Sequence, residues 1–200
     1  MQYLTLKSKV KIGCNICDKC CINRGDIKLT PINIIEISKY MNISIEEFIS
    51  KYTKALTDEP PEMVIKTTGD KYTCILNNQD TNKCSVHSVK PMQCVMFPLV
   101  PVDLEHDIFF NQNTCPYEQN QEIKVIDWLN GKKGIYVKYK KLYIKWINLM
   151  ETLQKKWSSI PSDTQGEIYK ILYYDYDSGK GNIKRMVNNN IKQVYKIIKK

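Results

Sequence analysis

The chain has 200 residues, enough for one domain with a hydrophobic core or for a domain with an extension. Its formal net charge is +9, and residues 121–200 carry 17 Lys and Arg against 7 Asp and Glu, whereas all eight cysteines lie within residues 14–115. No apolar run approaches the roughly 20 residues that cross a bilayer, and the first residues, MQYLTLKSKVKIGC, lack the features of a secretory signal, so we expect a cytoplasmic protein without a membrane span.

The first predicted elements are two short helices that follow the first group of cysteines. Thr30 is a suitable N-cap and Pro31 suits the first helical position, so a helix is predicted from there to a tight link at residues 41–43. Ser44 and Glu47 have the S-x-x-E spacing of a capping box and predict the start of the second helix. Apolar residues recur at helical spacing in both segments: Ile34, Ile35, Ile37 and Met41, then Ile45, Phe48, Ile49 and Tyr52.

The middle of the chain predicts strands and loops. Residues 63–66 and 72–76 flank a turn at Gly69–Asp70, and together they predict a β-hairpin. A polar loop is expected over 77–83, and an irregular extended segment is expected over 97–101 because of its two prolines.

From about residue 123 the pattern becomes helical. Four helices are predicted there, over 123–129, 136–157, 164–173 and 181–199. We therefore expect a mainly α protein with a minor β-hairpin. In it, residues 1–120 form an irregular cysteine-rich metal-binding core, and residues 121–200 form a basic helical C-terminal extension that packs on this core.

The cysteines are the feature of the sequence that carries most chemistry. They are Cys14, Cys17, Cys20, Cys21, Cys74, Cys84, Cys94 and Cys115. The first three have C-x₂-C-x₂-C spacing, which lets several thiolates converge on one metal, as in zinc ribbons and ferredoxins. The Cys-Pro pair that ends a ferredoxin run is missing locally and occurs only at Cys115, so ligands would have to come from several segments.

Three interpretations of the cysteines remain open on the residues alone. All eight could be ligands of two four-thiolate sites, or about four could hold one [4Fe–4S] cluster, or the set could form disulfides. Disulfides are disfavoured by the absence of a signal peptide and because the adjacent Cys20 and Cys21 could bridge each other only with strain. The spacing does not decide between iron and zinc, since both accept all-thiolate sites.

The segments CNICDKCC from Cys14, CSVHSVKPMQCVMFP from Cys84 and TCPY at Cys115 resemble the YkgJ-type cysteine-cluster family of zinc- or iron-chelating domains. All eight cysteines of the family pattern have a counterpart over about residues 14–117, Cys74 included. The resemblance implies a metal centre whose ligands are these eight cysteines. A similar cysteine-rich region in flagellin lysine-N-methylases implies, as an alternative, lysine N-methylation with S-adenosylmethionine.

The sequence departs from that family pattern at three positions. His87 stands where the family has Tyr, and Lys90 and Val95 stand where it has Arg. Lys90 keeps a positive charge but not the bidentate geometry of a guanidinium group, which puts an anion-binding role of the family arginines in doubt. His87 is a candidate ligand, although eight cysteines already saturate two sites, and His106 is expected on the surface.

Two other segments have a functional and a plain structural interpretation. Residues 30–52 could be a DNA-binding helix-turn-helix, but Glu46 and Glu47 disfavour DNA contact, and the alternative is a helical hairpin that packs over the cysteine cluster. The lysine- and aromatic-rich segment 136–157 could stack on RNA or lie on a membrane surface, but its apolar stripe at helical spacing favours core packing.

The leading hypothesis is a cytoplasmic metalloprotein that chelates an iron–sulfur cluster, or else zinc, through its eight cysteines, with a structural, redox or sensing role. One alternative is the S-adenosylmethionine-dependent lysine methyltransferase. Another is a protein that binds nucleic acid, or an acidic protein partner, through the basic residues 121–200. The sequence identifies no catalytic residue.

Overall fold

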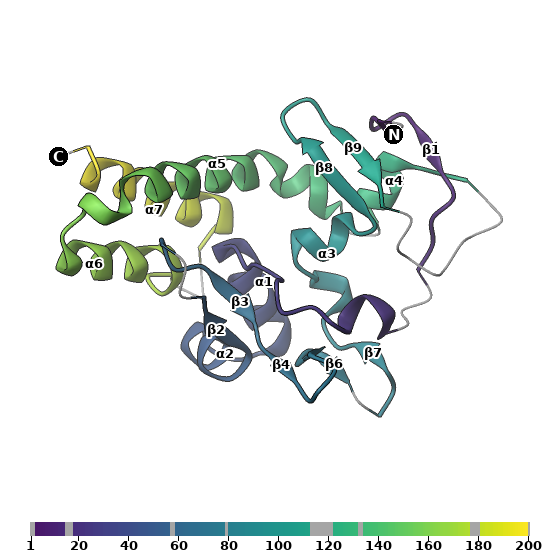
Figure 1. Ribbon diagram of the computed structural model, residues 1–200, viewed down its shortest axis with the longest axis horizontal. Coiled ribbons are helices and arrows are strands. Elements are labelled where there is room, and N and C mark those ends of the chain that lie inside the picture. The colour runs from purple at the N-terminus through teal and green to yellow at the C-terminus, as the bar shows by residue number, and fades with distance from the viewer. Residues whose placement is uncertain are drawn as a thin grey trace. The chain divides into compact units, whose positions relative to one another are not determined.

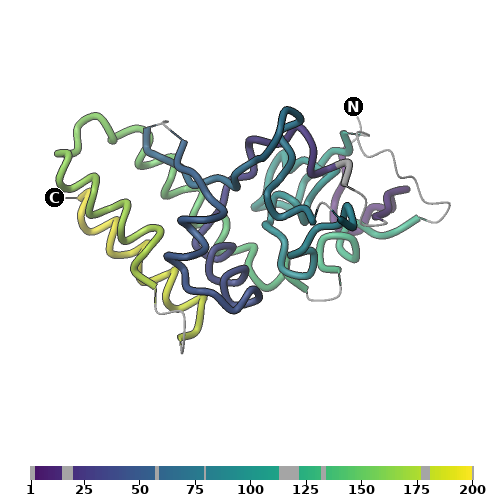
Figure 2. The backbone as a smooth tube through the Cα atoms, turned by 90° about the horizontal axis from the view of Figure 1, so that it is seen from below, coloured from purple at the N-terminus to yellow at the C-terminus, as the bar shows by residue number. Residues whose placement is uncertain are grey.

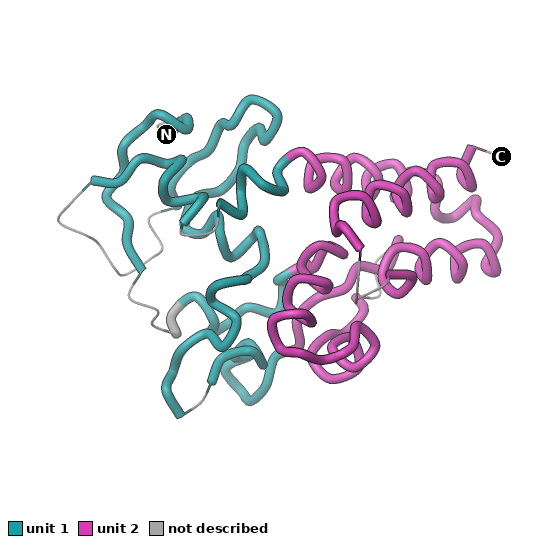
Figure 3. The backbone as a smooth tube through the Cα atoms, turned by 180° about the vertical axis from the view of Figure 1, so that it is seen from behind, with its two compact units in different colours: residues 1–27, 67–140 teal, residues 28–66, 141–200 magenta. Residues whose placement is uncertain are grey.

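The structure is a computed structural model that describes residues 3–14, 18–56, 59–78, 80–112, 122–131, 134–176 and 181–199, the side chains of residues 18 and 19 excepted. The chain folds into two compact units, and neither is a continuous stretch of sequence (Figure 3). Unit 1 consists of Met1–Ile27 and Thr67–Lys140, and unit 2 consists of Lys28–Lys66 and Lys141–Lys200. All eight cysteines belong to unit 1. The division into functional domains at residue 120 stays a prediction.

Unit 2 is helical apart from one small antiparallel sheet (Figure 1). Its elements are α1 (Pro31–Met41), α2 (Ile45–Tyr52), β2 (Thr53–Ala55), β3 (Met63–Ile65), most of α5 (Ile135–Lys156), a 3-10 turn (Trp157–Ser159), α6 (Ser162–Tyr173) and α7 (Ile183–Ile197). Helix α1 packs on α2, α6 and α7, and the tube in Figure 2 shows α6 and α7 side by side. The helical hairpin of α1 and α2 therefore shares its core with the C-terminal helices.

The predicted helix starts at Thr30 and Ser44 are both confirmed. The Thr30 hydroxyl accepts a hydrogen bond from the Asn33 N–H, and the Asn33 side chain accepts one from the Thr30 N–H at 3.0 Å, so this N-terminus has a full capping box. Ser44 accepts from the Glu47 N–H at 3.0 Å. The capping box expected there is half formed, because the Glu47 carboxylate accepts from Lys51 at 2.7 Å instead.

The core of unit 2 is built from apolar helix faces. The stripe on α5 is buried, as the core interpretation predicts, with Trp146 in edge-to-face contact with Tyr173 at a centroid distance of 5.6 Å. The largest fully buried side chains of this unit include Ile34, Ile35, Ile37, Phe48 and Tyr173. None of the described helices combines the length and the apolar character needed to cross a membrane.

Unit 1 is assembled from short elements. They are β1 (Lys9–Val10), a 3-10 turn η1 (Asp18–Cys21), β4 (Thr67–Thr68), β5 (Thr73–Cys74), β6 (Asn77–Asn78), β7 (Lys83–Cys84), η2 (His87–Val89), α3 (Met92–Met96), β8 (Leu99–Asp103), β9 (Ile108–Asn111), β10 (Ile123–Lys124), α4 (Val125–Asn130) and the first turn and a half of α5. Its four described sheets each have two strands. Phe109 is fully buried against Tyr136 and gives this unit an aromatic core contact at 6.0 Å.

The predicted hairpin is only partly right. Strand β3 does not pair with residues 72–76. It pairs with β2, and Lys28 bridges to Val64 on its other edge, so both edges of β3 are occupied. The neighbouring residues 67–68 pair with Thr73–Cys74 instead. The expected polar loop contains the β6–β7 hairpin, and the expected irregular segment at 97–101 opens the β8–β9 hairpin. The coarse prediction of a mainly α protein with minor β structure is confirmed.

Candidate metal centre

Five segments of unit 1 carry the six described cysteines. Cys14 precedes η1, which carries Cys20 and Cys21, and the remaining three lie on β5, β7 and α3: Cys74, Cys84 and Cys94. All six are free thiols, with Cys14 exposed, Cys74 buried and the other four between these extremes. The predicted ligands Cys17 and Cys115 lie outside the described residues.

Two consecutive hairpins place Cys74 and Cys84. Cys74 is opposite Thr67 in the β4–β5 pair, and Cys84 is opposite Asn77 in the β6–β7 pair. The turn η1 packs against β7, and the residues after η1 are tied to the β4–β5 turn by backbone bonds from the Asn23 N–H to the Lys71 carbonyl and from Arg24 to Tyr72. Cysteines more than fifty residues apart in sequence are thereby brought into one region.

The thiols of Cys20 and Cys21 form an asymmetric pair. The pKa of Cys20 is lowered to about 6, first by a hydrogen bond from the Cys21 thiol and then by the positive charges of Lys90 and Arg24, against the effect of burial. The pKa of Cys21 is raised, because its proton is held by Cys20, because it is partly buried and because other thiols lie nearby. The two shifts have the same consequence: they favour the thiolate form of Cys20 and the protonated form of Cys21.

The three later thiols have raised pKa values chiefly because their sulfur atoms are shielded from water, although only Cys74 is buried as a whole residue. Burial raises the pKa of Cys94 to about 12 and also raises those of Cys74 and Cys84, and in each case other cysteines of the group raise it further. Thiols influence one another in this way only when they are close in space. Backbone hydrogen bonds to Cys74 and Cys84 act in the opposite direction and favour the thiolates.

Two basic residues stand beside the thiols. Lys90 lowers the pKa of Cys20, Cys84 and Cys94, and its Nζ lies 5.9 Å from the centroid of the Trp128 ring. Arg24 acts on Cys20, lies 5.8 Å from the Phe97 ring and pairs with Asp26 at 2.8 Å. Sequence reasoning picked out Lys90 through the family pattern. It missed Arg24, whose sequence context gives no signal because the β4–β5 turn places it.

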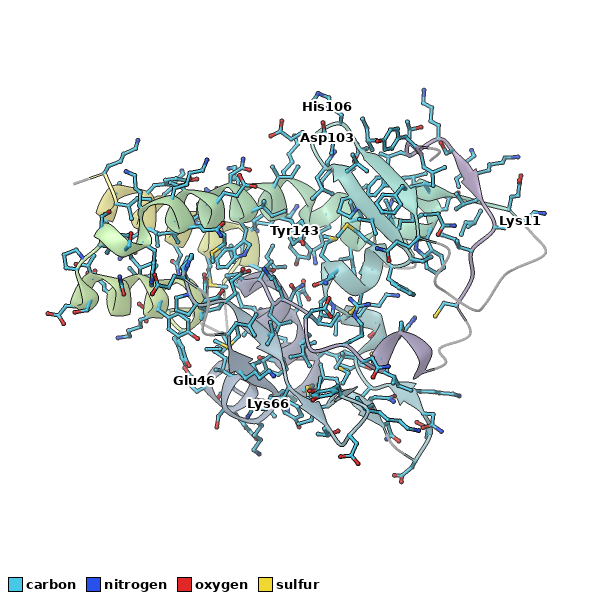
Figure 4. The ribbon with its side chains drawn as sticks, in the orientation of Figure 1. Lys11, Glu46, Lys66, Asp103, His106 and Tyr143 are labelled. Carbon is cyan, nitrogen blue, oxygen red and sulfur yellow. The ribbon has the colours of Figure 1, made fainter. Side chains whose placement is uncertain are left out.

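The two histidines have different surroundings. His87 Nε2 lies 3.8 Å from Cys14 Sγ. Burial and then Lys90 lower the pKa of His87, which favours the neutral imidazole, the form whose ring nitrogen can coordinate a metal. His106 is exposed, as expected, and its Nδ1 lies 2.7 Å from a carboxylate oxygen of Asp103 in the β8–β9 turn (Figure 4). That carboxylate raises the pKa of His106.

The donors present suit a thiophilic metal. Soft thiolates with a nearby imidazole favour zinc and iron over the hard cations magnesium and calcium. Among the described side chains, no group of three or more His, Cys, Asp or Glu stands in a metal-binding arrangement. The region thus gathers suitable donors, while two predicted ligands are in segments that are not described.

A comparison with protein families gives a direct match to this region. The family model CxxCxxCC, described as a putative zinc- or iron-chelating domain, matches residues 13–125. This range covers more than half of the chain and includes every cysteine. The chain belongs to the CxxCxxCC family. No solved structure matches it.

The CxxCxxCC match confirms the resemblance based on cysteine spacing and extends from just before Cys14 to the start of α4. The match therefore includes α1 and α2 of unit 2 but neither α6 nor α7. The family description names zinc and iron together, which agrees with a donor set that suits both metals.

Proposed function

We propose that the protein is a thiolate metalloprotein whose unit 1 holds an iron–sulfur cluster through the cysteines of the CxxCxxCC pattern, with zinc as the alternative metal. The single observation that supports this proposal best is that thiols from four separate elements lie close enough for Cys20 to affect the pKa values of Cys21, Cys74, Cys84 and Cys94. All eight cysteines are proposed as ligands, Cys17 and Cys115 among them.

The surrounding residues suit a centre with negative charge. Lys90 and Arg24 offset the charge of the thiolates, and backbone N–H groups donate to Cys74 and Cys84. Metal binding would displace the proton of Cys21, so that both adjacent cysteines could act as ligands. A bound iron–sulfur cluster would supply electron transfer, and the same thiolates around zinc would supply a cross-link between the two hairpins and η1.

The other two hypotheses receive less support. The CxxCxxCC description mentions a metal and no methyl-group transfer or nucleic acid. The lysine-rich α5 buries its aromatic side chains Tyr136 and Tyr139, so these are not available for stacking on bases. The proposed role is accordingly structural, redox or sensing rather than methyl transfer.

Anaerobic purification followed by iron, zinc and acid-labile sulfide analysis tests the proposal. We expect a brown protein with a broad absorbance near ~400 nm. Cys84→Ser and Cys94→Ser should lower the metal content. Met96→Leu, which changes a buried sulfur on the same helix as Cys94, serves as the matched control and should keep it.

The outcomes separate the parts of the proposal. A colourless protein with stoichiometric zinc would reject the iron–sulfur cluster and keep the thiolate centre. A folded protein with eight free thiols and no bound metal after anaerobic purification would reject both.

A further inference from the structure

Unit 2 contains a cavity that has no part in the cysteine region. Its volume is about 340 Å³, within the range of pockets that hold small molecules. It lies between α5, the segment before α1 and the segment before β3, and it contains no cysteine. Every lining residue belongs to unit 2.

One wall of this cavity is an apolar and aromatic face of α5. Tyr143, Trp146, Ile147 and Met150 follow one another at i, i+3, i+4 and i+7, so they share one side of the helix. Tyr143 is labelled in Figure 4 on the lower side of α5. Trp146 is fixed from behind by its edge-to-face contact with the buried Tyr173. This contact holds the Trp146 ring in place within the wall.

The rim of the cavity carries an excess of negative charge. Three carboxylates line it, from Glu59, Glu62 and Glu151, against the single ammonium group of Lys28. Glu62 accepts from Lys28 at 2.6 Å. Glu59 and Glu151 are exposed, and the described residues give neither of them a hydrogen bond or an ion pair. A net negative rim is unexpected in a chain of charge +9.

The aromatic wall and the carboxylate rim both favour a positively charged ligand. The face of a tyrosine or tryptophan ring attracts a cation, and carboxylates at the mouth of a partly enclosed site attract it further. The charge of Glu62 reaches into the pocket, because it adds to burial in raising the pKa of Tyr143. The net negative charge of the rim would repel an anion, and a neutral ligand would gain no charge–charge attraction from it.

We propose that this cavity binds a small organic cation, in which an ammonium group lies between the carboxylates and its alkyl substituents contact Tyr143, Trp146 and Met150. The proposal is independent of the metal centre, because its residues lie in the other unit.

The test is calorimetric titration of the full-length protein, as purified anaerobically, with choline and, in a parallel arm, with n-butylammonium. The neutral isostere 3,3-dimethylbutan-1-ol is the ligand control, since it has the shape of choline without the charge. We expect at least one of the two cations to bind at least about tenfold more tightly than the alcohol, and its binding to weaken with added salt. The arm that binds more tightly identifies a quaternary or a primary ammonium ligand.

A charge-neutral variant tests the rim. Glu59→Gln combined with Glu151→Gln should weaken binding of the preferred cation by roughly tenfold, because two unpaired charges are lost. Glu46→Gln is the matched control. Glu46 is an exposed carboxylate on α2 of the same unit, it does not line the cavity, and Figure 4 labels it. Equal affinity for choline, n-butylammonium and the alcohol, or unchanged affinity in the double variant, would overturn the proposal, as would the absence of binding by both cations at millimolar concentration.

Discussion

The adjacent thiols of Cys20 and Cys21 illustrate how two identical side chains acquire different chemistry at the scale of single residues. Both lie on η1 and have similar burial, yet the pKa of one is lowered and that of the other is raised. The difference arises because one hydrogen bond stabilises the charge on Cys20 and, in doing so, holds the proton on Cys21. The positive charges of Lys90 and Arg24 further stabilise the negative charge of the Cys20 thiolate.

This asymmetry predicts selective alkylation in metal-free protein kept in native buffer. With a pKa lowered to about 6, the Cys20 thiolate persists down to about that pH and is lost as the pH falls through it. At pH 7 iodoacetamide should therefore modify Cys20 faster than Cys94 by roughly an order of magnitude, as read by peptide mass spectrometry.

The variant Cys21→Ala removes the hydrogen-bond donor and should shift the pH midpoint of Cys20 alkylation upward. Lys90→Gln should shift it less, because its charge is a smaller cause than the hydrogen bond. If Cys20 and Cys94 react at equal rates at pH 7, the asymmetric pair does not form in solution.

His87 gives a second prediction at this scale. Its Nε2 is 3.8 Å from Cys14 Sγ, so it is a neighbour of the thiols, while the proposed ligands are the eight cysteines. His87→Tyr, which restores the residue of the family pattern, should keep the metal content per chain measured by elemental analysis. Cys84→Ser should reduce it. A loss of metal in His87→Tyr equal to that in Cys84→Ser would make His87 a ligand.

At the scale of elements, the start of α1 depends on one buried cap. Thr30 is 4% exposed and shares a capping box with Asn33. Thr30→Ala should lower the free energy of unfolding by about 1–2 kcal/mol, because the Asn33 N–H loses the hydroxyl that accepts its hydrogen bond. Urea denaturation followed by circular dichroism measures the change. Thr30→Ser keeps the hydroxyl and should cost less than Thr30→Ala, and equal losses in the two variants would exclude the cap as the cause.

Helices α1 and α2 could be predicted from the sequence because each has both a cap and a 3.6-residue pattern. The starts of α1 and α2 at Thr30 and Ser44 and the end of α4 at Gly131 follow from such local signals. The hairpins β4–β5 and β6–β7 could not be predicted in the same way. Their strands have two residues each, too few for a period of two to be recognised.

The β4–β5 turn carries one usual signal, Gly69 with φ 66°, but this signal does not fix which residues pair. Tyr72 has φ 45° and Asn82 has φ 51°, and a tyrosine in the left-handed region is not a residue that turn rules would choose. The pairing partners of β3, Thr53–Ala55 on one edge and Lys28 on the other, likewise come from other parts of the chain. Tertiary contacts therefore decide these pairings, and local sequence does not encode them.

At the scale of the whole molecule, the metal donors are confined to one of two units. Metal binding is therefore expected to stabilise unit 1 and to leave unit 2 unchanged. Unit 1 should stay folded after chelation, because the core contact between Phe109 and Tyr136 involves none of the proposed metal ligands.

Hydrogen exchange with and without chelator tests this expectation. Amides of residues 3–14, 18–27 and 67–112 should lose protection when metal is removed, while those of α1, α6 and α7 should not change. Equal loss of protection in both units would show that they unfold as one cooperative structure.

The metal-donor residues of the candidate site could be predicted from the sequence, but their arrangement in space could not. The eight cysteines could be identified because thiol spacing is local, and the CxxCxxCC match confirms the family that they indicate. The partners of those thiols depend on two hairpins and on contacts across more than fifty residues, as the positions of Arg24 and Lys90 show. Sequence alone therefore left the number of metal centres open.

The interleaved order of the two units has a consequence for synthesis on the ribosome. Unit 1 is complete once residue 140 has emerged, whereas the segment Lys28–Lys66 of unit 2 was made first and must wait for Lys141–Lys200. Until α6 and α7 appear, α1 can pack on α2 but lacks its other two helical partners. During that interval the core around Ile34, Ile35 and Ile37 is incomplete, so translation speed after residue 140 should influence how much of the protein reaches its native state.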